Sequence, residues 1–155
     1  MRIRLITATS FGWLGCALVL LAGAGFSAPA AEMKLQAFLL WGTNENKPPP
    51  DKQYNPAPPD IQERLRVLPL KWTNWFEVNR KEFAALLGTS RHVAMSAKCQ
   101  VDMKQLGGEE VEVRLIGKGK EVLRRKQALP KGEALILGGD APNSTSWLVV
   151  LKRIE

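Results

Sequence analysis

Two residues of this 155-residue chain could together act as a nucleophile and a base. His92 is the only histidine, and Cys99 is one of two cysteines. An imidazole within hydrogen-bond reach of a thiol can activate it for nucleophilic attack. On a continuous strand the two residues would lie about 23 Å apart, at about 3.3 Å per residue, unless the chain turned at Ser96. Since Cys99 falls among apolar positions, we predict instead a buried thiol and a surface histidine.

No other catalytic or metal-binding signature is present in the sequence. It lacks Cys-x-x-Cys and His-Glu-x-x-His spacings, a Gly-x-Ser-x-Gly elbow, a phosphate-binding loop and a dinucleotide fingerprint. Glu109, Glu110 and Glu112 crowd a hairpin whose outer face should be wet, and such a face offers no cleft for a carboxylate pair. We therefore predict a non-enzymatic protein with no catalytic residue, metal ion or cofactor. A hydrolase that uses His92 is the minor alternative.

Trp75 is the aromatic residue that stands among polar neighbours. On an alternating strand it shares a face with Thr73, Glu77 and Asn79, and an aromatic ring beside polar side chains can stack on a sugar ring or anchor a partner. Trp75, Glu77 and Asn79, with Asn44 from a proline-rich loop, form the first candidate surface. The favoured alternative is that Trp75 packs beneath that loop, because a loop without a core of its own needs a support. The other tryptophans of the mature chain fit core positions: Trp41, Trp72 and Trp147.

Basic residues form the second candidate surface. They gather in one charged segment and its two flanking turns: Lys118, Lys120, Arg124, Arg125, Lys126 and Lys131. Such a cluster can attract a polyanion, although Glu121 and Glu133 dilute it. No aromatic residues alternate with these cations, so we do not expect sequence-specific binding of nucleic acid.

The clearest structural pattern lies in residues 98–116. Apolar Cys99, Val101 and Met103 alternate with polar residues, and Val111, Val113 and Leu115 do the same. This pattern predicts an antiparallel hairpin with one buried and one wet face. A loop of three residues, 107–109, would pair Met103 with Val113 and keep both in the core, whereas a two-residue loop would pair core with surface.

Other segments read as short strands. Residues 33–41 alternate and then become apolar on both faces, residues 72–79 alternate, and residues 121–129 form a charged strand that suits a sheet edge. Residues 133–137 and 147–151 are apolar runs that indicate strands covered on both faces. Residues 79–88 fit either a capped helical turn or, preferably, a strand that returns from a tight turn at residues 80–81.

Prolines interrupt this pattern in residues 42–59, which we predict to be an extended surface loop. Asp60 could then cap a short helix over residues 60–67, which should end before Pro69. Seven or eight short strands with frequent turns predict a mainly β fold, either an antiparallel β-sandwich or a small barrel.

Residues 1–30 have the pattern of a secretory signal peptide. A start with Arg2 and Arg4 precedes an apolar stretch over residues 11–26, and Ala28-Pro-Ala30 then offers a cleavage site. An uncleaved anchor, the alternative, would need about 20 strongly apolar residues. Lipidation at Cys16 is disfavoured because the apolar run continues beyond it. We therefore expect export to the periplasm or the extracellular space, with no membrane-spanning segment after leader removal.

The mature chain would be residues 31–155, a length that suits a single β domain. The full chain carries 22 Lys and Arg against 15 Asp and Glu, and loss of Arg2 and Arg4 changes the net charge from +7 to +5. Loss of the leader also removes Cys16, so Cys99 has no partner for an intramolecular disulfide. The fold must then depend on its apolar core, and the lone thiol should be buried.

Four segments of the mature chain stand out together with the leader. They are Leu39-Leu-Trp-Gly-Thr-Asn44 with its proline loop, Trp75-Phe-Glu-Val-Asn-Arg-Lys81, Lys98-Cys99 and Trp147-Leu-Val-Val150. In these features the chain resembles a group of small, uncharacterised exported bacterial envelope proteins. The resemblance covers most of the mature chain and implies a compact β-sandwich-like domain. It implies no activity, so no functional residue is carried over from it.

These observations lead to two functional hypotheses. In the first, the protein is an exported, non-enzymatic binding or accessory module of the bacterial cell envelope, and it contacts an envelope protein or glycan through Trp75, residues 44–59 or both. In the second, it binds polyanions through the basic strand. Retention on heparin that falls steeply with salt would support the second.

Overall fold

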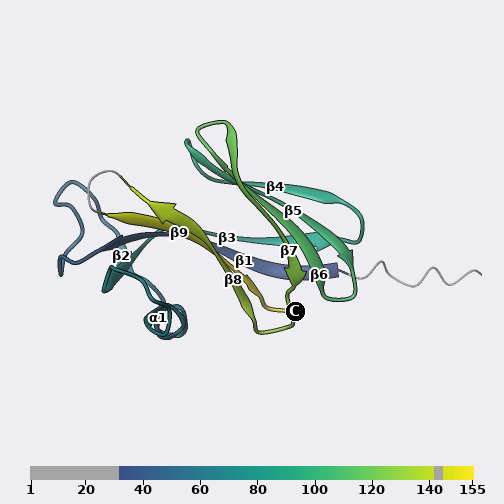
Figure 1. Ribbon diagram of the computed structural model, residues 1–155, viewed down its shortest axis with the longest axis horizontal. Coiled ribbons are helices and arrows are strands. Elements are labelled where there is room, and N and C mark those ends of the chain that lie inside the picture. The colour runs from purple at the N-terminus through teal and green to yellow at the C-terminus, as the bar shows by residue number, and fades with distance from the viewer. Residues whose placement is uncertain (1–31, 142–144) are drawn as a thin grey trace, which may run out of the picture.

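The computed structural model describes residues 32–141 and 145–155 and shows a mainly β domain with two antiparallel sheets (Figure 1). Its strands are β1 (Glu32–Thr43), β2 (Asn55–Pro56), β3 (Asn74–Leu86), β4 (Ser90–Ser96), β5 (Cys99–Gly107), β6 (Glu110–Gly117), β7 (Lys120–Ala128), β8 (Ala134–Asp140) and β9 (Ser146–Arg153). One helix is described, α1 (Pro59–Arg66). The leader and its proposed cleavage site lie outside the described residues.

The two sheets form a sandwich. Sheet A has the order β2-β3-β1-β9-β8, and sheet B has the order β4-β5-β6-β7. Sheet B is a meander of consecutive strands inserted between β3 and β8, so the chain leaves sheet A once and returns to it once. The sheets remain separate layers (Figure 1), which confirms the predicted sandwich and sets aside the barrel alternative.

Alternating side chains build the core between the sheets. On β1 the residues facing sheet B are Met33, Leu35, Ala37 and Leu39, and each is at most 7 % exposed. Sheet B supplies the residues that the sequence pattern predicted for the hairpin: Cys99, Val101, Met103, Val111, Val113 and Leu115. The period of two therefore places the two apolar faces against each other.

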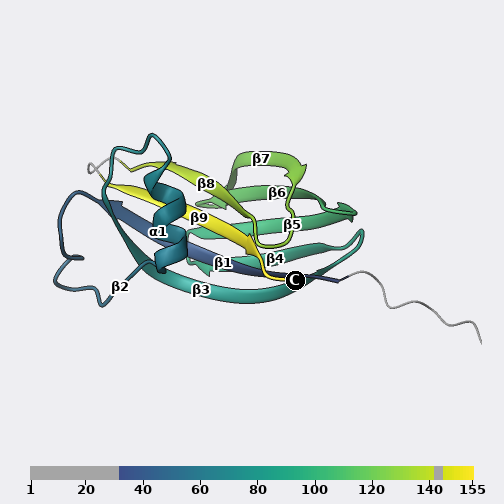
Figure 2. The ribbon, with the colours of Figure 1, turned by 90° about the horizontal axis from the view of Figure 1, so that it is seen from below.

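A second core lies on the outer face of sheet A. Phe38 and Leu40 of β1 pack there with Leu148 and Val150 of β9 and with residues of α1. The helix crosses this face of the sheet (Figure 2). The second half of β1 and the apolar run of β9 are therefore covered on both faces, as the sequence pattern predicts.

The helix starts differently from the prediction. Pro58 occupies the N-cap and Pro59 begins the helix, with no side-chain cap. Proline suits the first turn because the backbone N–H groups there have no helical partner. Asp60 therefore lies inside the first turn, where its carboxylate pairs with Lys152 Nζ at 2.5 Å. The prediction that Asp60 caps the helix is wrong, and the side chain instead ties α1 to β9.

Strand β3 runs straight through residues 79–86, so the predicted turn at residues 80–81 is wrong. The pairing of β3 with β1 continues from Thr43↔Asn74 to Glu32↔Leu86. Long-range pairing with the central strand overrides the local turn signal. A bulge at Val78 interrupts the register, since Leu39 pairs with Asn79 whereas Leu40 pairs with Glu77.

The hairpin of β5 and β6 has the predicted register, with Met103 opposite Val113. Its turn differs, because Gly107 pairs with Glu110 and Leu106 forms a bulge in place of a third loop residue. Positive φ angles at Gly107 and Gly108 permit this turn. Strand β4 was not predicted, although Val93 and Met95 alternate with polar residues and both are buried.

Candidate functional site

Trp75 is buried, which corrects the hypothesis that its ring offers an open face. The residue is 6 % exposed and belongs to the core between sheet A and α1. Its ring meets Trp72 edge-on at 6.3 Å, and its carbonyl accepts a hydrogen bond from the N–H of Ala57 in the proline-rich loop. Trp75 therefore supports the loop and the helix, in line with the favoured alternative. Trp41, Trp72 and Trp147, predicted as core residues, are more exposed than Trp75.

The other members of the first candidate surface point in different directions. The bulge at Val78 reverses the alternation, so Asn79 no longer shares a face with Glu77. Asn79 donates to the carbonyl of Met95 on sheet B, while Glu77 binds Arg80 at 2.7 Å. Asn44 accepts a hydrogen bond from the Thr73 N–H. The four residues therefore form no common surface. The sequence pattern could not show this, because a bulge changes which face of the strand the following side chains point to.

The basic residues of the second candidate surface do lie together, along β7 and its flanking turns. This strand pairs only with β6 among the described strands, so it is the predicted edge strand. All six cations are exposed. Arg124 and Lys126 lie opposite Arg114 and Glu112 on the outer face of sheet B, whereas Arg125 lies opposite Val113 and points to the other side. The cations therefore surround the strand.

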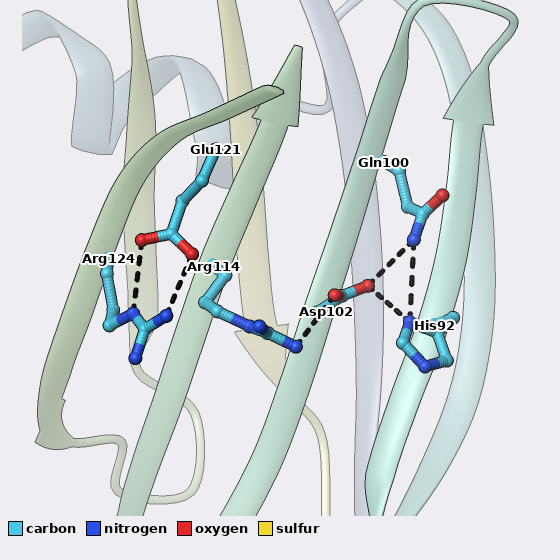
Figure 3. Close-up of polar contacts among 6 residues, drawn as sticks. All are labelled: His92, Gln100, Asp102, Arg114, Glu121 and Arg124. Atoms are coloured by element: carbon cyan, nitrogen blue, oxygen red, sulfur yellow. Dashed lines mark hydrogen bonds and ion pairs between the residues drawn. The ribbon is translucent and has the colours of Figure 1, made fainter. Parts of the chain in front are cut away.

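Two of the six cations are already paired with carboxylates. Arg124 binds Glu121 through two hydrogen bonds of 3.1 and 2.9 Å (Figure 3), and Lys126 lies 3.4 Å from Glu112. Hydrogen bonding to Arg124, followed by its charge, lowers the pKa of Glu121 even though burial opposes this. The remaining four cations make no ion pair with a described residue: Lys118, Lys120, Arg125 and Lys131.

A polar row that the sequence did not reveal crosses the outer face of sheet B (Figure 3). His92 on β4 lies directly opposite Asp102 on β5, and Asp102 lies opposite Arg114 on β6. The His92 Nδ1 to Asp102 Oδ1 distance is 2.5 Å, and Arg114 Nη2 donates to Asp102 Oδ2 at 3.0 Å. Gln100 also donates to Asp102 Oδ1, at 2.8 Å.

Asp102 is the buried centre of this row. Only 6 % of its side chain is exposed, although it lies on the outer face. Burial opposes ionisation most strongly, but hydrogen bonds from Gln100 and His92 and the charges of His92 and Arg114 outweigh it and lower the pKa of Asp102. The alternating pattern of the sequence is enough to predict that Asp102 lies on the solvent-facing side of its strand. Only the pairing of β4, β5 and β6 shows that hydrogen-bond donors surround its carboxylate.

His92 and Cys99 lie on opposite faces of sheet B. His92 is exposed on the outer face, and Cys99 belongs to the core between the sheets. Burial raises the pKa of the Cys99 thiol to about 11, so the nucleophilic thiolate is scarce at neutral pH. The predictions of a buried thiol and a surface histidine are confirmed, and this arrangement gives no thiol–imidazole pair.

No group of three or more His, Cys, Asp or Glu side chains in residues 32–141 and 145–155 is arranged to hold a metal ion. In the same residues no helix has the length and apolar character needed to cross a membrane.

Two cavities open at the surface of the described residues and are large enough to compare with ligand sites. One, of about 260 Å³, lies between α1 and the pair Trp72 and Trp75. The other, of about 460 Å³, lies at the end of the sandwich where Cys99 and Trp147 meet the turns of sheet B. Comparison with known protein families, curated proteins and solved structures finds no match to this chain.

Proposed function

We propose that this protein is an exported, non-enzymatic module of the cell envelope that binds an acidic polysaccharide through β7 and the two turns that flank it. The leader pattern supports export, and the basic edge supports the choice of ligand. The observation that carries the proposal is the exposure of six cations along one edge strand and its flanking turns, four of them in no ion pair among the described residues.

The arrangement of these cations suits an extended polymer better than a compact ligand. They follow a strand of nine residues, which spans about 30 Å at 3.3 Å per residue. Their side chains emerge on both sides of the strand, so successive acidic groups of a chain can each meet a cation. No cleft is needed, because attraction between a charged edge and a polyanion acts over about a Debye length, roughly 8 Å at physiological ionic strength.

The test is retention of the purified protein on immobilised heparin in a salt gradient. We compare the wild type with the triple variant Lys120→Gln, Arg125→Gln and Lys126→Gln. The wild type should be retained at moderate salt, and the variant should bind at least about tenfold more weakly, since each cation near an anionic surface contributes about 1 kcal/mol. The slope of affinity against salt should also decrease.

A control variant removes the same charge elsewhere. Lys47→Gln, Arg66→Gln and Lys81→Gln alter exposed cations on the loop, α1 and β3, which do not belong to sheet B and do not pair with β7. This control should retain nearly wild-type affinity. Equal weakening by both variants would mean that only net charge matters, and elution of the wild type at low ionic strength would also reject the proposal.

A further inference from the structure

The larger cavity lies where the two sheets diverge. Figure 1 shows sheet B separating from sheet A toward the end that carries the β4–β5 and β6–β7 turns. The cavity there has a volume of about 460 Å³. This value falls within the range of about 300 to 1,000 Å³ that is typical of small-molecule sites.

The walls of this cavity are mainly apolar. Leu39 and Trp147 come from sheet A, Cys99 and Val122 come from sheet B, and Ala141 follows β8. Apart from two lysines, the polar side-chain groups in the lining are the indole N–H of Trp147 and the hydroxyl of Ser96, which already accepts a hydrogen bond from the Lys98 N–H. An apolar group that enters the cavity would therefore gain contacts without leaving many polar groups unpaired.

A bulge in β7 shapes the cavity mouth. Leu115 pairs with Leu123 and Ile116 pairs with Glu121, so Val122 is the extra residue. Val122 is 57 % exposed, although it is apolar, and it lies against Gly117 so closely that a Cβ there would come within 2.9 Å of its side chain. The bulge thus directs an exposed apolar side chain toward the opening.

Two lysines also line the cavity, one from each turn. The N–H of Lys118 donates to the carbonyl of Lys98 at 2.8 Å, so the β4–β5 and β6–β7 turns are joined. Both lysines are exposed, and neither is ion-paired in residues 32–141 and 145–155. Lys118 has a φ of 51°, a value that favours glycine or asparagine, so this position carries a lysine against its backbone preference.

We propose that this cavity binds the alkyl chain of a single-chain amphiphile and that Lys98 and Lys118 hold its carboxylate head at the mouth. Apolar walls match the chain, and the two uncompensated ammonium groups select a negative head. The proposal shares Lys118 with the polysaccharide-binding edge but does not rest on polysaccharide binding, because the cavity and Lys98 lie at the end of the sandwich and not along β7.

The test is calorimetric titration of the purified protein with decanoate at concentrations below micelle formation. Decanoate should bind with a stoichiometry of one. Decyltrimethylammonium, which has the same chain and a positive head, should bind at least about tenfold more weakly, and butyrate should not bind measurably. Bound decanoate should also slow the labelling of Cys99 by a thiol reagent, since Cys99 lines the cavity.

Two variants test the head and the chain separately. Lys98→Gln with Lys118→Gln should weaken decanoate binding about tenfold, whereas Lys47→Gln with Lys81→Gln removes the same charge elsewhere and should not. Ala141→Leu should fill the cavity and abolish binding, whereas Ala94→Leu on the exposed outer side of β4 should leave it unchanged. Circular dichroism of each variant checks that the fold persists.

The proposal is overturned if decanoate does not bind, if both cavity variants bind it like the wild type, or if the cationic amphiphile binds equally well. The protein could instead form a dimer that Val122→Glu dissociates. That result would assign this face to a second copy of the chain and would also overturn the proposal. The Lys120, Arg125 and Lys126 variant should still bind decanoate, and Ala141→Leu should still bind heparin. Failure of one proposal is therefore distinguishable from failure of the other.

Discussion

Asp102 shows how a single carboxylate organises the outer face of sheet B. A side chain on a solvent-facing strand is normally hydrated, but three donors on three strands cover this one. The arrangement connects β4, β5 and β6 through their side chains in addition to the backbone ladder. Ion pairs of this kind contribute less when their partners are exposed, and His92 is 63 % exposed at its side chain.

We expect Asp102→Asn to change how stability depends on pH. The folded-state pKa of Asp102 lies below its ordinary value of 3.8, so the unfolded chain binds the proton more readily. The stabilisation is therefore present above about pH 4 and is lost as pH falls through the folded pKa. At pH 7 the variant should be less stable by about 1 kcal/mol, and the difference from wild type should shrink below pH 4.

Urea unfolding between pH 7 and pH 3 measures this effect. Glu110→Gln is the matched control, since Glu110 is an exposed carboxylate on β6 of the same sheet. The control should follow the wild-type pH dependence. If Asp102→Asn did the same, the row around Asp102 would make no contribution to stability.

Cys99 should react slowly with thiol reagents in the native protein. The residue is 7 % exposed, and its raised pKa of about 11 leaves roughly one thiol in a thousand ionised at pH 8. Mass spectrometry of the peptide that contains Cys99 should show labelling that is far faster after unfolding in urea. Equal rates in the native and unfolded states would contradict the assignment of Cys99 to the core.

At the scale of elements, β1 and β3 approach closely where Gly42 faces Trp75. A Cβ at position 42 would lie 2.4 to 2.8 Å from three atoms of the Trp75 ring. The absence of a side chain at Gly42 therefore leaves the space that the Trp75 ring occupies beneath the loop and α1. This contact depends on register, because Gly42 and Trp75 are directly opposite partners.

Gly42→Ala should destabilise the protein by about 1 to 3 kcal/mol, the usual cost of overpacking a core. Trp75→Phe provides a smaller ring, so the double variant should be more stable than the sum of the two single effects predicts, by about 0.5 kcal/mol or more. Chemical denaturation of the four proteins measures this coupling. Strict additivity would mean that the glycine is not required by the ring.

At the scale of the whole molecule, backbone amides should be best protected from hydrogen exchange in sheet A, which lies between sheet B and α1. β1 pairs with both β3 and β9, its inner face lies in the inter-sheet core, and the second half of its outer face is covered by the α1 core. Among the described strands β7 pairs with β6 alone, and nearly all of its residues are exposed. Edge strands open at lower free energy than central ones.

Hydrogen exchange followed by mass spectrometry should therefore resolve β1 from β7. Amides of β1 should exchange at least about a hundredfold more slowly than those of β7, because local opening energies extend from near zero to the global value. Strand β4, the other edge of sheet B, serves as the internal reference and should resemble β7. Comparable protection in β1 and β7 would contradict the layered arrangement.

The sequence by itself determined the class of fold and most of its strands. Alternation identified the hairpin and the core residues Val101, Met103 and Val113, since a period of two depends only on local geometry. Proline located the loop and the end of the helix that the structure describes. The basic character of β7 and the burial of Cys99 could also be predicted, because charge and apolarity are properties of the residues themselves.

Only the tertiary structure decided which residues meet. The bulge at Val78 separates Glu77 from Asn79, and the register of three strands surrounds Asp102 with His92 and Arg114. Trp75 is buried because α1 and the loop cover its face of sheet A. The end cavity likewise needs both sheets to form. Contacts of this kind join positions that are distant along the chain, and their free energies depend on register and packing that local pattern does not contain.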